Sequence, residues 1–265
     1  MSIIGRLTTA VITVVWSLLA LAGPVRAQQS EPVVAAASDL QFALVEVAEA
    51  FRVSTGKSVK LTFGSSGNFA RQIRQNAPFQ IFFSADEDFI RGLAKDGFMR
   101  DDGELYAVGR IVLFVPKGSP LKPDGTLADI KVALADGRLK KLAIANPEHA
   151  PYGTRAEEAL RHAGLWVAIR DKLVFGENVS QAAMFTASGN TQGGIIAYSL
   201  ALSTRISGLG TYELIPAEMH KPLRQRMGLI KSAGPVAEAF YTFAKSPHAR
   251  TIFRAYGFVL PGEAF

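Results

Sequence analysis

Short apolar runs alternate with amphipathic stretches along most of this sequence. Each run has the length of a buried strand, and each following stretch repeats its apolar side chains at the spacing of a helix. Strands that alternate with helices of about 10 to 15 residues indicate βαβ units and a parallel sheet. The sequence therefore predicts an α/β fold. In the first half of the chain, the predicted strands are 33–37, 59–63 and 81–84, and the predicted helices are 40–53, 69–75 and 89–96.

One strand pattern is longer than the others. Residues 106–115 have the sequence YAVGRIVLFV and end at a segment rich in Pro and Gly, residues 116–120. A single α/β domain is compatible with the chain length, but a long strand with such an exit favours a crossover between two lobes. A second α/β series follows, with predicted strands at 142–145, 173–175, 194–198 and 227–231 and predicted helices at 154–163, 180–188 and 235–256.

The N-terminal segment has the pattern of an export signal. It carries one early cation, Arg6, then an apolar run over 10–21 and the small-residue pattern Val25-Arg26-Ala27. This is typical of a secretory signal peptide cleaved after Ala27. An uncleaved anchor is the alternative, but the run is shorter than the ~20 residues that span a bilayer. We therefore expect residues 1–27 to be removed and the protein to be exported to the periplasm.

Composition excludes several classes of function. The chain contains no cysteine, so it has no disulfide scaffold, thiolate metal site or cysteine nucleophile. With 29 Lys and Arg against 23 Asp and Glu the net charge is +6, and loss of Arg6 and Arg26 with the signal lowers it to +4. This excess is spread along the chain, without the basic stripe and interleaved aromatics of nucleic-acid binders. We expect no nucleic-acid partner.

Enzyme motifs are weak. The four histidines lack metal-site spacing, and the dinucleotide and P-loop glycine motifs are absent. Gly64-Ser65-Ser66-Gly67 places its glycines one residue too close for a nucleophile elbow. A secreted serine hydrolase that uses Ser66 with an unidentified base is a distant alternative. We expect neither catalytic residues nor a bound cofactor, and we do not expect an enzyme.

Four strand-to-helix junctions are rich in small, hydroxyl and amide residues, and none contains Lys. Ligands of open parallel sheets bind at such junctions, because free N–H groups and the helix dipole favour negative charge there. Helix capping alone explains any single junction. Four junctions, two in each lobe, favour a shared cleft that holds a small oxyanion with neutral donors. The junctions are 35–40, 63–68, 146–154 and 177–181.

Six segments at and around these junctions have a recognisable combination of sequences: VVAAASDL (33–40), LTFGSSGNFARQI (61–73), NAPFQIFFSAD (76–86), ANPEHAPYGTRAEEAL (145–160), ENVSQAAMF (177–185) and YGFVLPG (256–262). In these segments the chain resembles the molybdate-binding periplasmic proteins of ABC importers, the ModA type within the type II periplasmic binding protein fold. The resemblance covers essentially the whole chain after the signal.

This resemblance implies a two-lobed architecture. Each lobe is expected to hold a mostly parallel sheet flanked by helices, and two crossover strands near Gly109 and Gly228 are expected to join the lobes. We place residues 31–111 and 229–265 in the first lobe and residues 112–228 in the second. The resemblance also implies a monomer that captures molybdate or tungstate between the lobes and delivers it to an ABC-type permease of the inner membrane.

The resemblance also implies a ligand set. Ser38 and Ser66 match hydroxyl and amide ligands of the first lobe, and Ser65 is a weaker candidate beside them. Tyr152 and Val179 match positions of the second lobe whose backbone N–H groups point into the site. The molybdenum would be bound as its oxyanion through these groups, without a direct metal ligand.

Two positions depart from the family pattern. Many members carry a tyrosine hydroxyl just after a strand of the second lobe, where this chain has Ala197. Tyr198 comes one residue later, which in a strand turns it to the opposite face, so Tyr152 is the alternative source of a hydroxyl. Asp39 follows Ser38, and a carboxylate there repels a dianion unless it caps its own helix, which is the role we expect.

The orientation of Asp39 bears on the choice of ligand. Hydrogen phosphate carries a proton near neutral pH and needs an acceptor such as a carboxylate, whereas molybdate, tungstate and sulfate are fully ionised and need donors only. If Asp39 faced the cleft, phosphate-like ligands would become plausible. A receptor of the same fold for phosphate, sulfate or a small carboxylate is therefore the alternative function.

Overall fold

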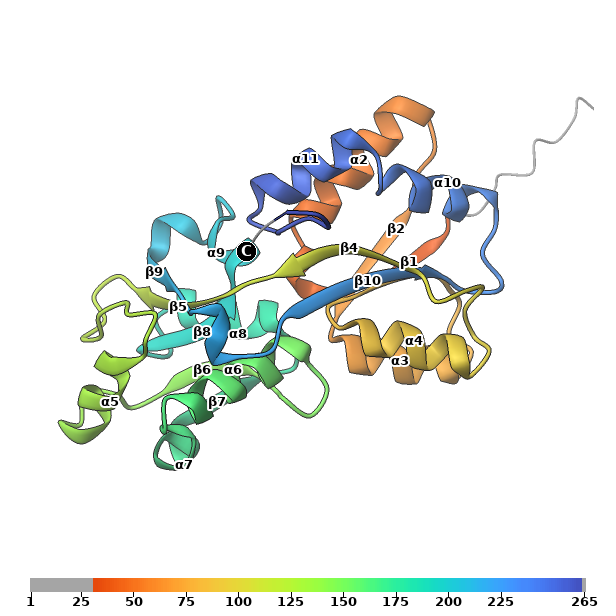
Figure 1. The fold of residues 1–265 in the computed structure, drawn as a ribbon. Helices are drawn as coiled ribbons and strands as arrows, with labels where there is room; N and C mark the ends of the chain where they lie inside the picture. Colours follow the sequence, from red (N-terminus) through yellow and green to blue (C-terminus); the bar gives the residue numbers. More distant parts are fainter. Residues whose placement is uncertain (1–30, 264–265) are drawn as a thin grey trace, which may run out of the picture. The chain divides into compact units, whose positions relative to one another are not determined.

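Two five-stranded sheets form the centre of the protein. The structure, a computed structural model, describes residues 31–263, and the signal peptide expected over 1–27 lies outside them. Helices pack around both sheets, so the predicted α/β fold is confirmed (Figure 1). We call the first sheet with its helices the first lobe, and the second sheet with its helices the second lobe.

The first sheet has the strand order β2-β1-β3-β10-β4. Strand β1 pairs in parallel with β2 and β3, whereas β10 is antiparallel to both β3 and β4. The sheet is therefore mixed, with one reversed strand. Its strands are β1 (Val33–Ala37), β2 (Lys60–Gly64), β3 (Phe79–Ser84), β4 (Glu104–Gly109) and β10 (Leu223–Leu229), and its helices are η1 (Ser38–Leu40), α2 (Ala43–Thr55), α3 (Ser66–Arg74), α4 (Glu87–Lys95), α10 (Pro235–Phe243) and α11 (Pro247–Ala255).

The second sheet repeats this arrangement in the order β7-β6-β8-β5-β9. Strand β6 is parallel to β7 and β8, and β5 is the reversed strand, antiparallel to β8 and β9. Its strands are β5 (Ile111–Pro116), β6 (Leu142–Ala145), β7 (Leu173–Gly176), β8 (Gly193–Ala197) and β9 (Gly210–Leu214), and its helices are α5 (Ala128–Ala135), α6 (Pro151–His162), α7 (Trp166–Ile169), η2 (Arg170–Lys172), α8 (Val179–Ala187), α9 (Tyr198–Ala201), η3 (Ser207–Leu209) and η4 (Ala217–Met219).

Alternating side chains of the first sheet pack into two layers. Val34 and Phe83 contribute to the core beneath α2, α10 and α11, whereas Ala35 and Phe82 contribute to the core beneath α3 and α4. Figure 1 shows these two groups of helices on opposite faces of the sheet. A strand buried on both faces needs apolar residues at every position, which explains the continuous apolar runs in the sequence.

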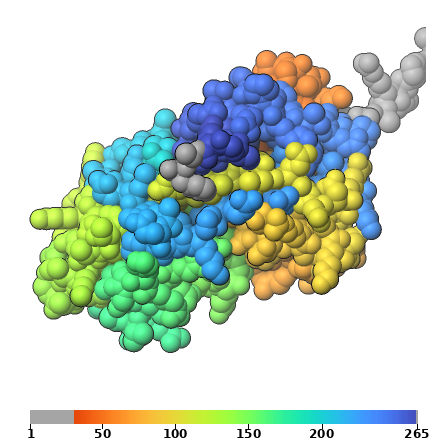
Figure 2. All heavy atoms as spheres, in the orientation of Figure 1, coloured from red at the N-terminus to blue at the C-terminus, as the bar shows by residue number. Residues whose placement is uncertain are grey.

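The chain passes between the sheets twice. Strands β4 and β5 follow one another with only Arg110 between them, so the long predicted strand at 106–115 is two strands in two sheets. The return crossing lies between the end of β9 at Leu214 and the start of β10 at Leu223. In the space-filling view, the second lobe (green to cyan) meets the first lobe (orange, yellow and dark blue) along one boundary (Figure 2).

The expected crossover at Gly228 is wrong. Gly228 lies inside β10 and pairs with Phe82 of β3, so residues 223–228 belong to the first sheet although the expected lobe bounds place them in the second. The apolar pattern predicted a strand only from residue 227, because the first half of β10 is mostly polar and leaves no apolar run in the sequence. Arg224 and Arg226 there pair with Glu87 of α4, and these ion pairs take the place of apolar packing.

Other differences have local causes. The predicted helix over 235–256 is two helices, because Ser246 caps the start of α11 by accepting a hydrogen bond from the Ala249 N–H and Pro247 occupies its first position. Helix α5 and strand β9 were not predicted from the sequence. Among the described residues, no helix combines the length and the apolar character needed to cross a bilayer.

Candidate functional site

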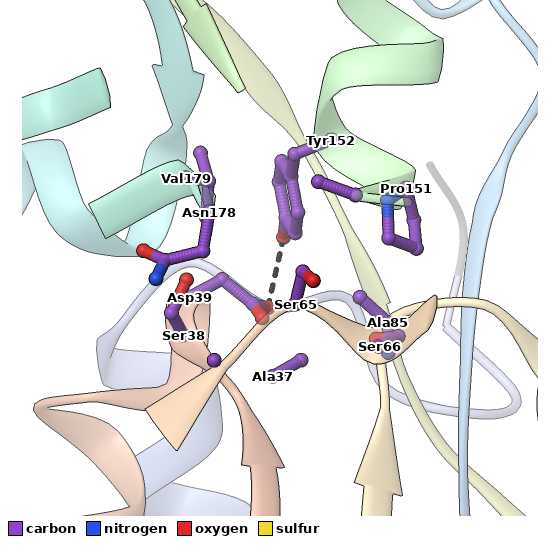
Figure 3. Close-up of a pocket in the computed structure, with 12 residues that line it drawn as sticks. Ala37, Ser38, Asp39, Ser65, Ser66, Ala85, Pro151, Tyr152, Asn178 and Val179 are labelled. Atoms are coloured by element: carbon purple, nitrogen blue, oxygen red, sulfur yellow. Dashed lines mark hydrogen bonds between the residues drawn. The ribbon is translucent and has the colours of Figure 1, made fainter. Parts of the chain in front are cut away.

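A small cavity lies where the four junctions meet, between the two sheets (Figure 3). Its volume of about 10 Å³ admits a single water-sized sphere. The strands that end at it, among them β1 and β2 of the first sheet and β6 and β7 of the second, all point their carboxyl ends toward it. The lining residues are Ala37, Ser38, Asp39, Gly64, Ser65, Ser66 and Ala85 from the first lobe and Ala150, Pro151, Tyr152, Asn178 and Val179 from the second.

Three helices begin at the cavity wall. Helix α3 starts at Ser66, α6 at Pro151 and α8 at Val179. First-turn N–H groups have no carbonyl partner within their own helix, and the positive end of the helix dipole lies among them. The N–H groups of Tyr152 and Val179 are in these first turns. None of the twelve residues described as lining the cavity is Lys or Arg, so the helix N-termini, and not cationic side chains, are the groups there that favour an anion.

Two buried hydroxyl groups are oriented by the backbone. Ser66 Oγ accepts a hydrogen bond of 3.0 Å from the Ala85 N–H, and Ser38 Oγ accepts one of 3.3 Å from the Ser180 N–H. A hydroxyl that accepts through its oxygen keeps its own hydrogen to donate. Both serines are almost fully buried and line the cavity, so their remaining donors are placed to serve an anion there.

The Asp39 carboxyl reaches toward Tyr152 of the second lobe, and the N–H groups of Asp39 and Leu40 in its own helix also lie near it. Its Oδ2 accepts hydrogen bonds from the Tyr152 hydroxyl at 3.0 Å and from Gln225 Nε2 at 2.7 Å, and Figure 3 shows the first of these. The expected capping role is therefore wrong: no side chain caps η1. A helix of three residues offers little dipole to a carboxylate, whereas Tyr152 and Gln225 offer two direct donors. Burial raises the pKa of Asp39 to about 6.

The bonds to Asp39 belong to a larger buried network. The Tyr106 hydroxyl donates to Gln225 Oε1 at 2.6 Å, and Gln225 Nε2 also lies 3.0 Å from the Tyr152 hydroxyl. Gly109 lies against this network, since a Cβ at that position would be 2.3 Å from the Tyr152 hydroxyl. Sequence reasoning missed Tyr106 and Gln225. The only available signal was a polar Gln within the segment that forms β10.

Contacts between the lobes close the cavity at its edge. Ser65 Oγ makes a hydrogen bond of 2.9 Å with His149 Nδ1, and the Gly67 N–H donates to the His149 carbonyl at 2.9 Å. The Ser65 hydroxyl is thus engaged with the second lobe. A carboxylate-to-guanidinium pair between Asp86 and Arg155, at 3.1 Å, links the lobes farther out.

Tyr198 is the one sequence candidate that does not line the cavity. It begins α9, and its ring packs on Tyr212 with 5.6 Å between the ring centroids. Tyr198 therefore begins a helix, whereas the prediction treated it as a strand residue turned to the opposite face. The other six candidates, Ser38, Asp39, Ser65, Ser66, Tyr152 and Val179, all line the cavity.

Comparison with known proteins identifies relatives over most of this length. The chain is 34% identical to the molybdate-binding protein ModA of Rhodobacter capsulatus, over 88% of this chain and 90% of that protein. The solved periplasmic molybdate-binding protein of Azotobacter vinelandii superposes with a TM-score of 0.79 at 32% identity, covering 87% of this chain and 100% of that one. The sulfate-binding protein SubI of Mycobacterium tuberculosis shares the fold, with a TM-score of 0.71 at 15% identity, over 88% of this chain and 87% of that one.

The family follows from these matches. The fold is that of the type II periplasmic binding proteins, as expected, although each sheet is mixed. The members matched are solute-binding proteins and not enzymes, so the serine hydrolase reading of Ser66 is set aside. Residues 32–259 match the bacterial extracellular solute-binding proteins, and the chain therefore belongs to that family, among the relatives of the molybdate-binding protein ModA.

Proposed function

We propose that this protein captures molybdate or tungstate as the free dianion and delivers it to an ABC-type permease of the inner membrane. The observation that carries the proposal is the cavity, where three helix N-termini and two buried hydroxyls converge without a Lys or Arg among the residues described as its lining. Such a site suits a small symmetric anion that needs donors on all sides. The names of the relatives supply the identity of the oxyanion.

The proposed ligand set draws on both lobes. The hydroxyls of Ser38 and Ser66 donate from the first lobe, and the N–H groups of Tyr152 and Val179 donate from the second. The molybdenum has no direct bond to the protein, because every contact is made to an oxygen of the anion. Capture of this cargo needs no cofactor.

Entry of the ligand requires the lobes to separate. The cavity, about 10 Å³, is lined by residues of both lobes, and the contacts at His149 join the lobes at its edge. We propose that the lobes open about Arg110 and the segment between β9 and β10, and that donors from both lobes favour the closed form once the anion is bound. Small-angle scattering is expected to show a smaller radius of gyration with molybdate than without it, and an unchanged radius contradicts closure.

Calorimetric titration tests the ligand. Molybdate and tungstate are expected to bind tightly, and sulfate and phosphate weakly. In a thermal-unfolding assay, a ligand at about 1,000 times its Kd adds about 4 kcal/mol to the free energy of unfolding. Binding of neither molybdate nor tungstate, together with clear binding of phosphate, would refute the proposal. That result would favour the second candidate, a hydrogen phosphate receptor, which the position of Asp39 beside the cavity supports.

Export and oligomeric state are part of the same proposal. We propose that cleavage after Ala27 releases a 238-residue monomer into the periplasm. Intact-mass measurement of protein recovered from the periplasmic fraction is expected to give the mass of residues 28–265. Light scattering during gel filtration is expected to give one chain per particle, and a dimer contradicts the monomer.

A further inference from the structure

The two oxygens of the Asp39 carboxyl have different surroundings. Oδ2 accepts hydrogen bonds from both Tyr152 and Gln225, whereas Oδ1 is buried without a hydrogen-bond partner among the described residues. The residue is 1% exposed and lines the cavity. A buried polar atom without a hydrogen-bond partner lowers the stability of the fold. Its position at a binding cavity indicates that a bound ligand supplies the missing hydrogen bond.

A deprotonated oxyanion in this cavity cannot donate a hydrogen bond to an ionised carboxylate. A fully deprotonated dianion offers only acceptors, and a carboxylate at a distance of a few ångströms repels it. A carboxylic acid is different, since its O–H donates. Oδ2 already accepts two hydrogen bonds, so Oδ1 is the oxygen free to carry the proton.

We propose that Asp39 binds the oxyanion as a carboxylic acid, with one proton entering the site for each molybdate bound and Oδ1–H donating to the anion. The proton comes from solvent, no covalent bond to the anion forms or breaks, and the net charge brought into the site falls from two negative charges to one. This inference rests on the proposed function. It makes Asp39 a residue that couples affinity to pH.

The surroundings of Asp39 leave it as the group that titrates. The titratable side chains that face it are the phenols of Tyr152 on α6 and Tyr106 on β4, and burial raises the pKa of both. Tyr198 of α9 turns to Tyr212 instead. Burial already raises the pKa of Asp39 to about 6, and a dianion beside it favours the acid further.

Charged groups on the other packed elements point elsewhere. The acidic and basic side chains of α2 and the Lys60 side chain of β2 are exposed, and α8 carries no titratable residue. On β10, Arg224 and Arg226 pair with Glu87. His149 lies at the cavity edge, bonded to Ser65 and 3.6 Å from the Glu177 carboxylate, so the experiment must separate it from Asp39.

Proton uptake can be measured directly. Molybdate is titrated calorimetrically into the wild-type protein between pH 6 and pH 8.5, in buffers that differ in ionisation enthalpy. One proton is expected to be taken up per molybdate at the alkaline end, where the affinity is expected to fall about tenfold for each pH unit. In Asp39→Asn, an isosteric neutral side chain, uptake is expected to vanish and the affinity to become independent of pH.

Two further variants locate the proton. Burial also raises the pKa of the Asp86 carboxyl. In the variants His149→Gln and Asp86→Asn, uptake of one proton per molybdate is expected to persist. Loss of uptake in either, with retention in Asp39→Asn, places the proton elsewhere and overturns the inference.

The wild-type measurement needs no variant to fold. Molybdate binding without proton uptake refutes the inference and leaves the proposed function intact. The absence of molybdate binding at every pH refutes the proposed function, and the inference with it.

Discussion

The two lobes share one strand order but offer the cavity different chemistry. In each sheet, three parallel strands are followed by a reversed strand, β10 in the first lobe and β5 in the second. The first lobe presents polar side chains, Ser38, Asp39 and Ser66, whereas the second presents the starts of α6 and α8, where Ala150 and Val179 line the wall. In the proposed ligand set, hydroxyl groups therefore come from the first lobe, beside the start of α3, and main-chain N–H groups come from the second.

Close helix packing makes the main-chain contribution possible. A Cβ on Gly153 would be 2.2 Å from the Ala145 carbonyl oxygen, and a Cβ on Gly176 would be 2.6 Å from the Ala182 nitrogen. The missing side chains let α6 and α8 approach the strands that precede them. A binding site can therefore depend on side-chain chemistry in one lobe and on backbone placement in the other.

The largest expected effect comes from removing the side-chain donors of the first lobe. The double variant Ser38→Ala and Ser66→Ala loses two hydrogen bonds to a charged ligand, and we expect binding to weaken by about 3–6 kcal/mol. Calorimetric titration with molybdate measures this loss. The exposed Ser54 of α2 gives a matched control, and Ser54→Ala is expected to bind as the wild type does. Equal affinity of the double variant and the wild type would contradict the division between the lobes.

The Asp39 carboxyl of the first lobe is expected to make the stability of the unliganded protein depend on pH. The pKa of Asp39 rises from 3.8 in the unfolded chain to about 6 in the fold, so the folded state binds the proton more tightly. Stability from this group is present below pH 3.8 and is lost as the pH rises through 6, a change of about 3 kcal/mol.

Denaturant unfolding at several pH values checks this sign. Asp39→Asn, without ligand, is expected to be more stable than the wild type at pH 7 by up to about 3 kcal/mol, with the difference shrinking toward pH 4. The exposed Asp171 serves as the control, and Asp171→Asn is expected to stay within about 0.5 kcal/mol of the wild type. A variant less stable at pH 7 than at pH 4, relative to the wild type, contradicts the sign.

A proline tests the main-chain donors of the second lobe. Val179 is the first residue of α8, where proline fits well, and Asn178 before it is extended at φ −155° and ψ 174°, as a residue before proline prefers. Val179→Pro therefore removes the N–H and little else, and we expect binding to weaken by about 1.5–3 kcal/mol. Val179→Ala keeps the N–H and is expected to bind normally. Two variants of equal affinity would remove the N–H of Val179 from the ligand set.

The smallest expected effect concerns the approach of the lobes. A Cβ on Gly67 would be 2.7 Å from the His149 carbonyl oxygen, across the boundary between the lobes. Gly67→Ala is expected to weaken molybdate binding by about 1–3 kcal/mol, since the lobes can no longer meet, while the stability of the unliganded protein does not fall. Gly92→Ala is the control, because a Cβ there meets only the Arg74 side chain at 3.4 Å. A loss of stability without a loss of affinity would show that Gly67 acts within its own lobe.

The sequence alone predicted most of the strands and helices and the two serine hydroxyls of the site, but not its backbone donors. Strands buried on both faces, such as β1 and β6, were located because continuous apolar runs mark them, whereas β10 was misplaced because ion pairs cover its polar half. Ser38 and Ser66 were found by their residue type. Tyr152 and Val179 were found only through the family resemblance, since a backbone donor leaves no signature in the side chain.

The orientation of the Asp39 side chain could not be predicted from the sequence, for a different reason. Its partners Tyr152 and Gln225 are 113 and 186 residues away along the chain, and only the packed lobes bring them together. A local rule, that an acidic residue at a helix start caps that helix, was overridden by two better donors. Long-range hydrogen bonds of this kind require the tertiary structure.

The division between side-chain and backbone donors has a consequence for how such a site changes over generations. A hydroxyl such as that of Ser38 can be lost or replaced through one substitution, so the first lobe is where new ligand preferences can arise. A main-chain N–H, such as that of Val179, survives every substitution except proline. The second lobe therefore retains its anion-binding N–H groups through most substitutions, while substitutions in the first lobe can change which anion is preferred.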